Sequence, residues 1–201
     1  MTEEVSTPSS RPALAEQRDV ETVYQPAADS RLLAETARSR VGADDRVLDV
    51  GTGSGYVAAQ IREATGARVV ASDLSPAACG DARAAGLPVV RANLVEPFVA
   101  DAFDVVVCNP PYLPTPPDQE WEDWMERALS GGPDGRAVID PFVRTVGRVL
   151  RADGVALLLV STLSDPEAVR ALAAESGFAV STVAEESHPF ERLLVLALRH
   201  R

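Results

Sequence analysis

Lysine is absent from this sequence, and its absence narrows the possible chemistry. All 19 basic residues among the 201 are arginine. Neither Schiff-base catalysis nor a phosphate-binding P-loop is expected, because both depend on a lysine side chain. The net charge of -11 and the isoelectric point near 4.6 give the wrong electrostatic field for holding a phosphate backbone. The composition therefore disfavours nucleic acid as a partner.

Cysteine and histidine are scarce, with two of each. Cys79 and Cys108 lie far apart, one in a helical and one in a strand pattern. We interpret them as buried free thiols rather than as a disulfide or a metal-binding pair. His188 and His200 have no neighbour at the spacing of metal ligands. The sequence therefore gives no support to metal catalysis.

Long hydrophobic runs are missing as well. The longest, residues 155–160 and 193–198, are far too short to span a bilayer. The first ten residues have neither the basic start nor the apolar centre of a secretory signal. We therefore predict a cytoplasmic protein with no membrane partner.

The length and the hydrophobic fraction of 46% suit one domain with a sizeable core. Residues 1–19 are rich in Ser, Thr, Pro and Glu without periodicity and predict a disordered tail, so the single domain is expected at 20–201. Alternating strand and helix patterns predict an α/β fold. The expected strands are 46–51, 68–72, 88–91, 103–108, 155–160, 178–183 and 191–198. The expected helices are one capped by Ser30, then 56–64, 75–85, 137–150 and 166–175, the last capped by Asp165 or Ser164.

A glycine-rich segment, GTGSG at 51–55, follows the first expected strand and precedes a helix. Glycines at such a turn let the backbone approach a ligand that faces the helix N-terminus. Asp73 ends the second strand about 20 residues beyond the glycines, where a carboxylate can accept hydrogen bonds from both hydroxyls of a ribose. This arrangement predicts a cofactor that contains a nucleoside.

Two residues distinguish between possible cofactors. Tyr56 stands where the dinucleotide fingerprint requires its third glycine, and Asp49, just before the loop, would repel a pyrophosphate but attract an ammonium group. S-adenosylmethionine has that ammonium and no phosphate, and we predict it as the cofactor. Asn93, followed by Leu94 after the third strand, carries an amide that fits an adenine edge; a simple turn asparagine is the alternative.

The fourth expected strand, 103–108, leads into Asn109-Pro110-Pro111-Tyr112, beside the glycine loop at the carboxyl edge of the sheet. An amide or exocyclic amine is a poor nucleophile, and it improves when two acceptors hold both of its hydrogens. The Asn109 side-chain carbonyl and the Pro110 backbone carbonyl can be those acceptors, and Tyr112 offers a flat face to a planar group. The pattern favours N-methylation; a proline-rich turn after a core strand is the alternative.

Several segments carry a resemblance to a known family. DVGTGSG, SDLSP and VCNPPY resemble a class I S-adenosylmethionine-dependent methyltransferase. VYQPAADSRLL, NPPYLPTPP and SGGPDGRAVIDPF resemble the HemK-like protein-(glutamine-N5) methyltransferases, of the short type known from eukaryotes and archaea, over about residues 24–198. The sequence departs from the family in Asn93, where Asp is usual, in Ala28, where Glu is common, and in lacking the N-terminal helical domain of the bacterial type.

The resemblance implies a fold, a site and partners. The fold is Rossmann-like, with a mostly parallel seven-stranded sheet, an antiparallel last strand and helices on both faces. The implied partners are a protein substrate, such as the Gly-Gly-Gln loop of a translation release factor, and a small zinc-binding activator subunit. The implied catalytic residues are Asn109, Pro110, Pro111 and Tyr112. The implied cofactor-binding residues are Ser30, Asp49, Gly51, Thr52, Gly53, Gly55, Asp73, Leu74, Asn93, Leu94 and Asn109.

Two other functions are alternatives to glutamine methylation. Adenine-N6 methylation of DNA or RNA would use the same segment, residues 109–112 (the NPPY tip), to hold an exocyclic amine. It would stack the base on Tyr112 and need a row of basic residues along the nucleic-acid strand. The acidic composition disfavours it. A cofactor-binding subunit without activity is disfavoured by the intact NPPY segment. Trp121 and Trp124 are consistent either with a substrate-recognition wall or with a cover over a core edge.

Overall fold

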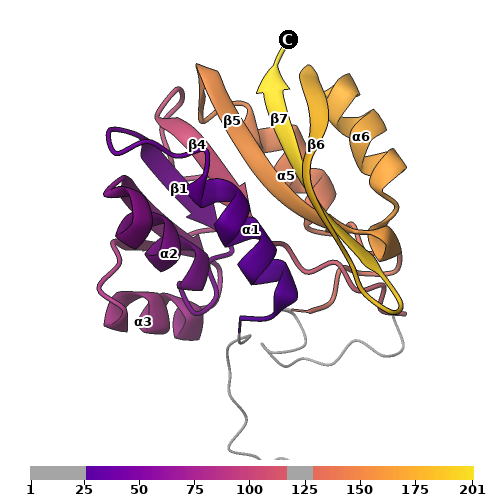
Figure 1. Ribbon diagram of the computed structural model, residues 1–201, viewed down its shortest axis with the longest axis horizontal. Helices are drawn as coiled ribbons and strands as arrows, with labels where there is room; N and C mark the ends of the chain where they lie inside the picture. The colour runs from indigo at the N-terminus through magenta and orange to yellow at the C-terminus, as the bar shows by residue number, and fades with distance from the viewer. Residues whose placement is uncertain (1–25, 117–128) are drawn as a thin grey trace, which may run out of the picture.

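A seven-stranded sheet organises the computed structural model, which describes residues 26–116 and 129–201 (Figure 1). The strands are β1 (Arg46–Val50), β2 (Arg68–Asp73), β3 (Val89–Arg91), β4 (Phe103–Cys108), β5 (Leu150–Ser161), β6 (Phe178–Ser187) and β7 (Arg192–His200). They lie in the order β3-β2-β1-β4-β5-β7-β6, and β7 runs antiparallel to both of its neighbours. The predicted fold class is therefore confirmed.

The central strand β4 shows why this sequence forms the middle of a parallel sheet. Successive side chains of a strand point to opposite faces, and both faces of such a sheet are covered by helices. Val105 and Val107 accordingly lie in one hydrophobic cluster, while Val106 and Cys108 lie in the other. Each of these four side chains is at most 3% exposed. An uninterrupted apolar run is the pattern that two buried faces require.

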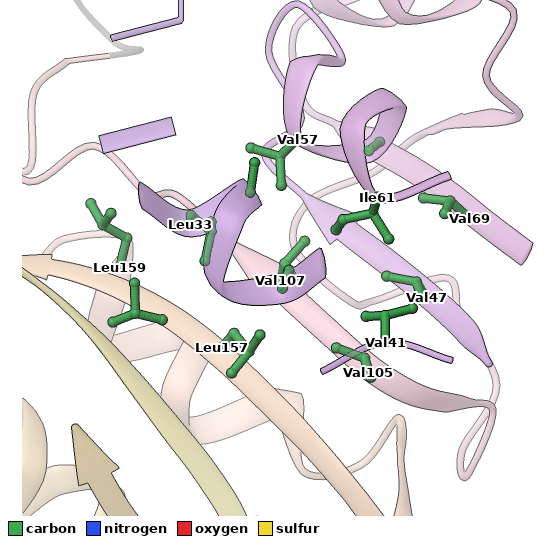
Figure 2. Close-up of a cluster of buried hydrophobic side chains, with 14 of the residues drawn as sticks. Leu33, Val41, Val47, Val57, Ile61, Val69, Val105, Val107, Leu157 and Leu159 are labelled. Atoms are coloured by element: carbon green, nitrogen blue, oxygen red, sulfur yellow. The ribbon is translucent and has the colours of Figure 1, made fainter. Parts of the chain in front are cut away.

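Helices cover the two faces of the sheet (Figure 1). Leu33 and Ile61, from α1 and α2, pack with Val107 and Leu157 of the sheet, as Figure 2 shows. Phe142 of α5 belongs to the cluster on the opposite face. The helices are α1 (Ala28–Arg38), α2 (Tyr56–Thr65), α3 (Pro76–Ala84), α5 (Ile139–Val146) and α6 (Pro166–Glu175), with a short 3-10 helix η3 (Thr162–Ser164) after β5.

The start of α1 differs from the prediction that Ser30 caps it. The helix begins at Ala28, and the cap position, Ala27, makes no side-chain hydrogen bond. Ser30 instead lies inside the first turn and is buried. Its backbone N–H donates to Asp29 Oδ1 at 2.6 Å, which satisfies one of the amides that a helix start leaves free. The Ser30 side chain is therefore available for another contact.

Other element boundaries also differ from the prediction, and the strand expected at 155–160 already begins at Leu150. The expected helix 137–150 ends at Val146, because Leu150 already pairs with Phe103 as the first residue of β5. The expected strand 178–183 continues to Ser187, which pairs with Arg192 in the β6–β7 hairpin. Antiparallel pairing across a hairpin extends a strand beyond the part that is apolar, so hydrophobicity alone does not locate its end.

Two smaller sequence predictions, the cap of α6 and the state of the two cysteines, are confirmed. Asp165 caps α6 by accepting a hydrogen bond from the Ala168 N–H at 3.2 Å, and Ser164 is not the cap. Cys79 and Cys108 are both buried free thiols. Within the two described ranges, no helix is long and apolar enough to cross a membrane. The predicted tail at 1–19, Trp121 and Trp124 lie outside the described residues, and the single domain at 20–201 stays a prediction.

Candidate functional site

The site lies where β1, β2 and β4 end. β1 is paired in parallel with β2 on one side and with β4 on the other, so their carboxyl ends meet at one edge of the sheet. Val50, the last residue of β1, pairs with Ser72 and with Cys108. The glycine loop, Asp73 and Asn109 follow those three positions directly. The predicted neighbourhood of the glycine loop and the NPPY segment is confirmed.

The loop after β1 needs glycine for two different reasons. Gly51 and Gly55 have φ values of 70° and 82°, in the left-handed region that disfavours other residues. A Cβ on Gly55 would lie 2.8 Å from Leu87 Cδ1, so packing also excludes a side chain there. A Cβ on Gly51 would meet nothing within 4 Å. The space beside Gly51 is therefore open to a ligand.

Asp73 joins the glycine loop to the next helix. Its Oδ2 accepts a hydrogen bond from the Gly53 N–H at 2.9 Å, and its Oδ1 accepts one from the Ser75 N–H at 2.8 Å. A carboxylate has about four acceptor positions, so each oxygen can still accept a further bond. Asp73 thus holds the loop in place and keeps acceptors for ribose hydroxyls. The sequence predicted the second property and not the first.

Asp49, at 2% exposure, is among the most buried charged residues of the described chain. Its Oδ2 accepts hydrogen bonds from Thr52 Oγ1 at 2.7 Å and from the Ala58 N–H at 3.2 Å. Burial raises the pKa of Asp49 to about 6, although these two hydrogen bonds act to lower it, and the nearby Asp73 charge adds to the rise. A cation bound beside Asp49 would stabilise its charged form.

The residues predicted for the adenine edge lie farther along the same edge of the sheet. Asn93 is exposed, and its Nδ2 donates to Glu96 Oε1 at 2.7 Å. Leu94 has a φ of 49°, and Leu74 is 48% exposed. The Ala92 N–H donates to Asp73 O at 2.9 Å, which ties this segment to the end of β2. The Glu96 contact uses one of the two N–H donors of the Asn93 amide.

Asn109 presents an unusual pair of atoms. Its Nδ2 donates to Ser30 Oγ at 3.2 Å, across 79 positions of sequence. Its Oδ1 is buried and has no hydrogen-bond partner among the described residues. A buried amide oxygen without a partner costs about 1–3 kcal/mol, so such an atom at a strand tip indicates a place where a ligand donates. Pro110, next in the chain, is buried, and Tyr112 is half-buried.

A second glycine segment supports the chain just after the NPPY tip. The Gly131 N–H donates to Leu113 O at 2.8 Å, and the Thr115 N–H donates to Gly132 O at 2.9 Å. A Cβ on Gly135 would lie 2.5 Å from Tyr112 O. Residues 129–135 therefore brace the tip. The sequence did not predict this supporting role for the three glycines.

The contacts among the implied site residues form separate pairs: Ser30 with Asn109, Asp49 with Thr52, and Asp73 with Gly53. Among the described residues, no group of three or more His, Cys, Asp or Glu side chains could hold a metal ion. The charged side chains of the site are Asp49 and Asp73, whose carboxylate oxygens accept hydrogen bonds. They suit a cationic ligand that carries hydroxyl groups.

Comparison with known proteins adds independent information. The family described as "Methyltransferase domain" matches residues 47–131. A putative protein N5-glutamine methyltransferase of Methanocaldococcus jannaschii is 32% identical over 179 residues, covering 87% of this chain and 90% of that protein. The methyltransferase HEMK2 of Homo sapiens is 30% identical over 192 residues, covering 87% of this chain and 88% of that protein.

A solved structure is similar over nearly the same extent. It is the E. cuniculi Mtq2-Trm112 complex, responsible for the methylation of the eRF1 translation termination factor. The TM-score is 0.73 at 29% sequence identity, covering 90% of this chain and 99% of the matched chain. The sequence relatives and the solved structure therefore all point to methylation.

Proposed function

The chain belongs to the HemK-like protein N5-glutamine methyltransferases, and from this premise we propose that it methylates the side-chain amide of a glutamine in a protein. The observation that carries the proposal is Asn109 Oδ1, a buried acceptor with no partner among the described residues, at the tip of β4. A glutamine amide has two N–H donors and so supplies what this oxygen lacks. The charge of the whole chain adds support, because it disfavours a nucleic-acid substrate.

S-adenosylmethionine, as the source of the methyl group, fits the carboxylates and the open space of the site. The free acceptor positions on Asp73 suit ribose hydroxyls, the buried Asp49 carboxylate suits a positive charge, and the open space beside Gly51 admits the ligand. When bound, this cofactor supplies an electrophilic methyl group on a sulfonium. The residues of the chain then have to bind, orient and shield the reacting groups.

The chain contributes mainly positioning to the reaction. Asn109 Oδ1 and the Pro110 carbonyl each accept one hydrogen of the glutamine amide, and the Tyr112 ring packs on its plane. With both hydrogens held, the nitrogen lone pair is left free to accept the methyl group that bound S-adenosylmethionine would supply. The amide nitrogen would then lose a proton to water. No strong general base is required, because the proton leaves after the transfer.

The proposed substrate is the Gly-Gly-Gln loop of a translation release factor, which places the reaction in the cytoplasm. The relatives support this choice, since the similar E. cuniculi complex methylates a termination factor. The same complex contains Trm112 as a second protein. We therefore include a small zinc-binding activator subunit of that kind as a partner of this chain.

The proposal is tested with purified components. The chain, co-expressed with an activator subunit, is incubated with labelled S-adenosylmethionine and a release factor, and the product is located by mass spectrometry. We expect one methyl group on the loop glutamine, and none when that glutamine is replaced by alanine. Asn109→Ala should lower the transfer rate about 100-fold, comparable to removing one preorganised hydrogen-bonding group, with a much smaller change in cofactor affinity.

Two results would contradict the proposal. Label on another residue of the release factor would remove glutamine as the acceptor. Near-parental turnover by Asn109→Ala, or equal losses of cofactor affinity and rate, would show that the NPPY tip is only a structural turn. Circular dichroism of the variant establishes that its fold is intact.

A further inference from the structure

Ser30 makes a contact that no feature of its own segment suggests. It lies in the first turn of α1, is 6% exposed, and its Oγ accepts a hydrogen bond from Asn109 Nδ2 at 3.2 Å. Asn109 follows β4, in another part of the chain. The contact therefore joins a helix on one face of the sheet to the tip that carries the unpaired Oδ1.

The contact holds the Asn109 amide in place, and the direction of the hydrogen bond, from Asn109 Nδ2 to the Ser30 oxygen, leaves Oδ1 facing outward. A serine hydroxyl can also donate, so this direction requires that the Ser30 hydroxyl acts as the acceptor. An asparagine amide has a nitrogen that only donates and an oxygen that only accepts. Rotation by a half turn would place the nitrogen where the oxygen now lies, opposite the N–H donors of a substrate amide. Two donors facing each other do not bind. With Nδ2 held by Ser30, Oδ1 is the atom left without a partner among the described residues.

Ser30 is itself held firmly. Its backbone N–H donates to Asp29 Oδ1 at 2.6 Å, and the Asp29 side chain is only 4% exposed. One turn further, Leu33 is fully buried in the cluster between α1, α2 and the sheet (Figure 2). The hydroxyl therefore has a fixed position relative to β4. A fixed acceptor is what a positioning role requires.

We propose that Ser30 is a positioning residue for the methyl acceptor: its hydroxyl holds Asn109 Nδ2 and thereby keeps Asn109 Oδ1 turned toward the substrate amide. The inference rests on the proposed function, whose reaction needs that oxygen. It assigns Ser30 to the acceptor side of the site, whereas the family resemblance implies a cofactor-binding role. The two roles differ in what they predict for cofactor affinity.

Three substitutions at Ser30 distinguish the effect of losing the hydroxyl from the effect of changing the side-chain volume. Ser30→Thr keeps a hydroxyl, Ser30→Ala removes it, and Ser30→Val has the shape of threonine without the hydroxyl. We expect Ser30→Ala and Ser30→Val to lower turnover about 10-fold, as for loss of one hydrogen bond. Ser30→Thr should recover to within about threefold of the parent on the same scale. Cofactor affinity by calorimetry should change less than about twofold in all three.

A double-variant cycle tests whether Ser30 acts through Asn109. If it does, adding Ser30→Ala to Asn109→Ala should cause no further loss of turnover, because the contact is already gone. Additive losses would overturn the proposal. So would a fall in cofactor affinity that matches the fall in turnover, or a Ser30→Val variant as active as Ser30→Thr.

A spectroscopic measurement keeps this test separate from the proposed function. In the parent, the Asn109 side-chain N–H signals, assigned by comparison with Asn109→Ala in nitrogen-15 NMR spectra, should be protected from solvent exchange. Ser30→Ala and Ser30→Val should lose that protection, and Ser30→Thr should keep it. Signals unaffected by Ser30→Ala would refute the positioning role even if glutamine is methylated. Failure of the parent to methylate any release factor would refute the function and leave these signals as they are.

Discussion

Burial raises the pKa of Asp49 and hydrogen bonding lowers it, and the effect of burial is the larger. The pKa of Asp49 rises from 3.8 to about 6, although Thr52 and Ala58 both donate to it. A group of this kind binds its proton more tightly in the folded than in the unfolded chain. Its contribution to stability is fully present below the unfolded pKa and is lost as the pH rises through the folded pKa.

The expected result is a fall in stability between about pH 4 and pH 7 that Asp49→Asn lacks. A rise of about two pKa units corresponds to about 3 kcal/mol of unfolding free energy. Urea unfolding of the cofactor-free chain at a series of pH values measures it. The Asp104 pKa is lowered, so its opposite effect falls at more acidic pH. Parallel curves of unfolding free energy against pH for the parent and Asp49→Asn would show that the Asp49 pKa is not shifted.

At the scale of elements, the NPPY tip is supported by residues 129–135, a segment far from it in the sequence. Residues 129–135 lie against residues 112–115 through backbone hydrogen bonds and an isolated bridge between Leu113 and Ser130. Gly135 approaches Tyr112 O so closely that no side chain fits between them. The position of the tip is therefore set from both sides, by β4 before it and by this segment after it.

Gly135→Ala should displace the tip and slow methyl transfer. Its φ of 76° is strained for alanine, and the new Cβ would lie 2.5 Å from Tyr112 O. Gly66→Ala is the matched control, because its φ of 75° is equally strained but nothing lies within 4 Å of its Cβ. Both should lose about 1–2 kcal/mol of stability from the left-handed backbone. Only Gly135→Ala should also lose about 10-fold or more in turnover, as is usual for misplaced reacting groups.

Stability by urea unfolding and turnover by label incorporation measure the two effects separately. Equal turnover in the two alanine variants would show that residues 129–135 do not position the tip. A loss of turnover in Gly66→Ala would show that backbone strain alone affects activity.

At the scale of the whole molecule, the charge bears on the kind of acceptor. The net charge of -11 repels a phosphate backbone at any distance that salt does not screen. Methyl incorporation from labelled cofactor in a cell extract should therefore resist nuclease and disappear with protease. Label that disappears with nuclease would favour adenine-N6 methylation instead.

The sequence predicts those parts of the molecule that depend on local pattern. The apolar run of β4 and the strand–glycine–helix order determine the sheet, and parallel pairing then brings Asn109 next to the glycine loop. The contact of Ser30 with Asn109 is not predictable in this way, because it joins positions 79 residues apart on different elements. The support of Tyr112 by Gly135 is missed for the same reason, since a glycine in sequence does not show what lies against it.

The glycine loop is preorganised for cofactor binding. Gly51 and Thr52 donate their N–H groups to Ser72 O at 2.8 and 2.9 Å, and Gly53 donates to Asp73, so hydrogen bonds to β2 hold the loop in place. Its conformational entropy is therefore lost when the chain folds. A ligand that arrives meets a preorganised surface and does not have to order it. Association should then be limited by encounter rather than by loop closure, and the observed rate should rise linearly with cofactor concentration.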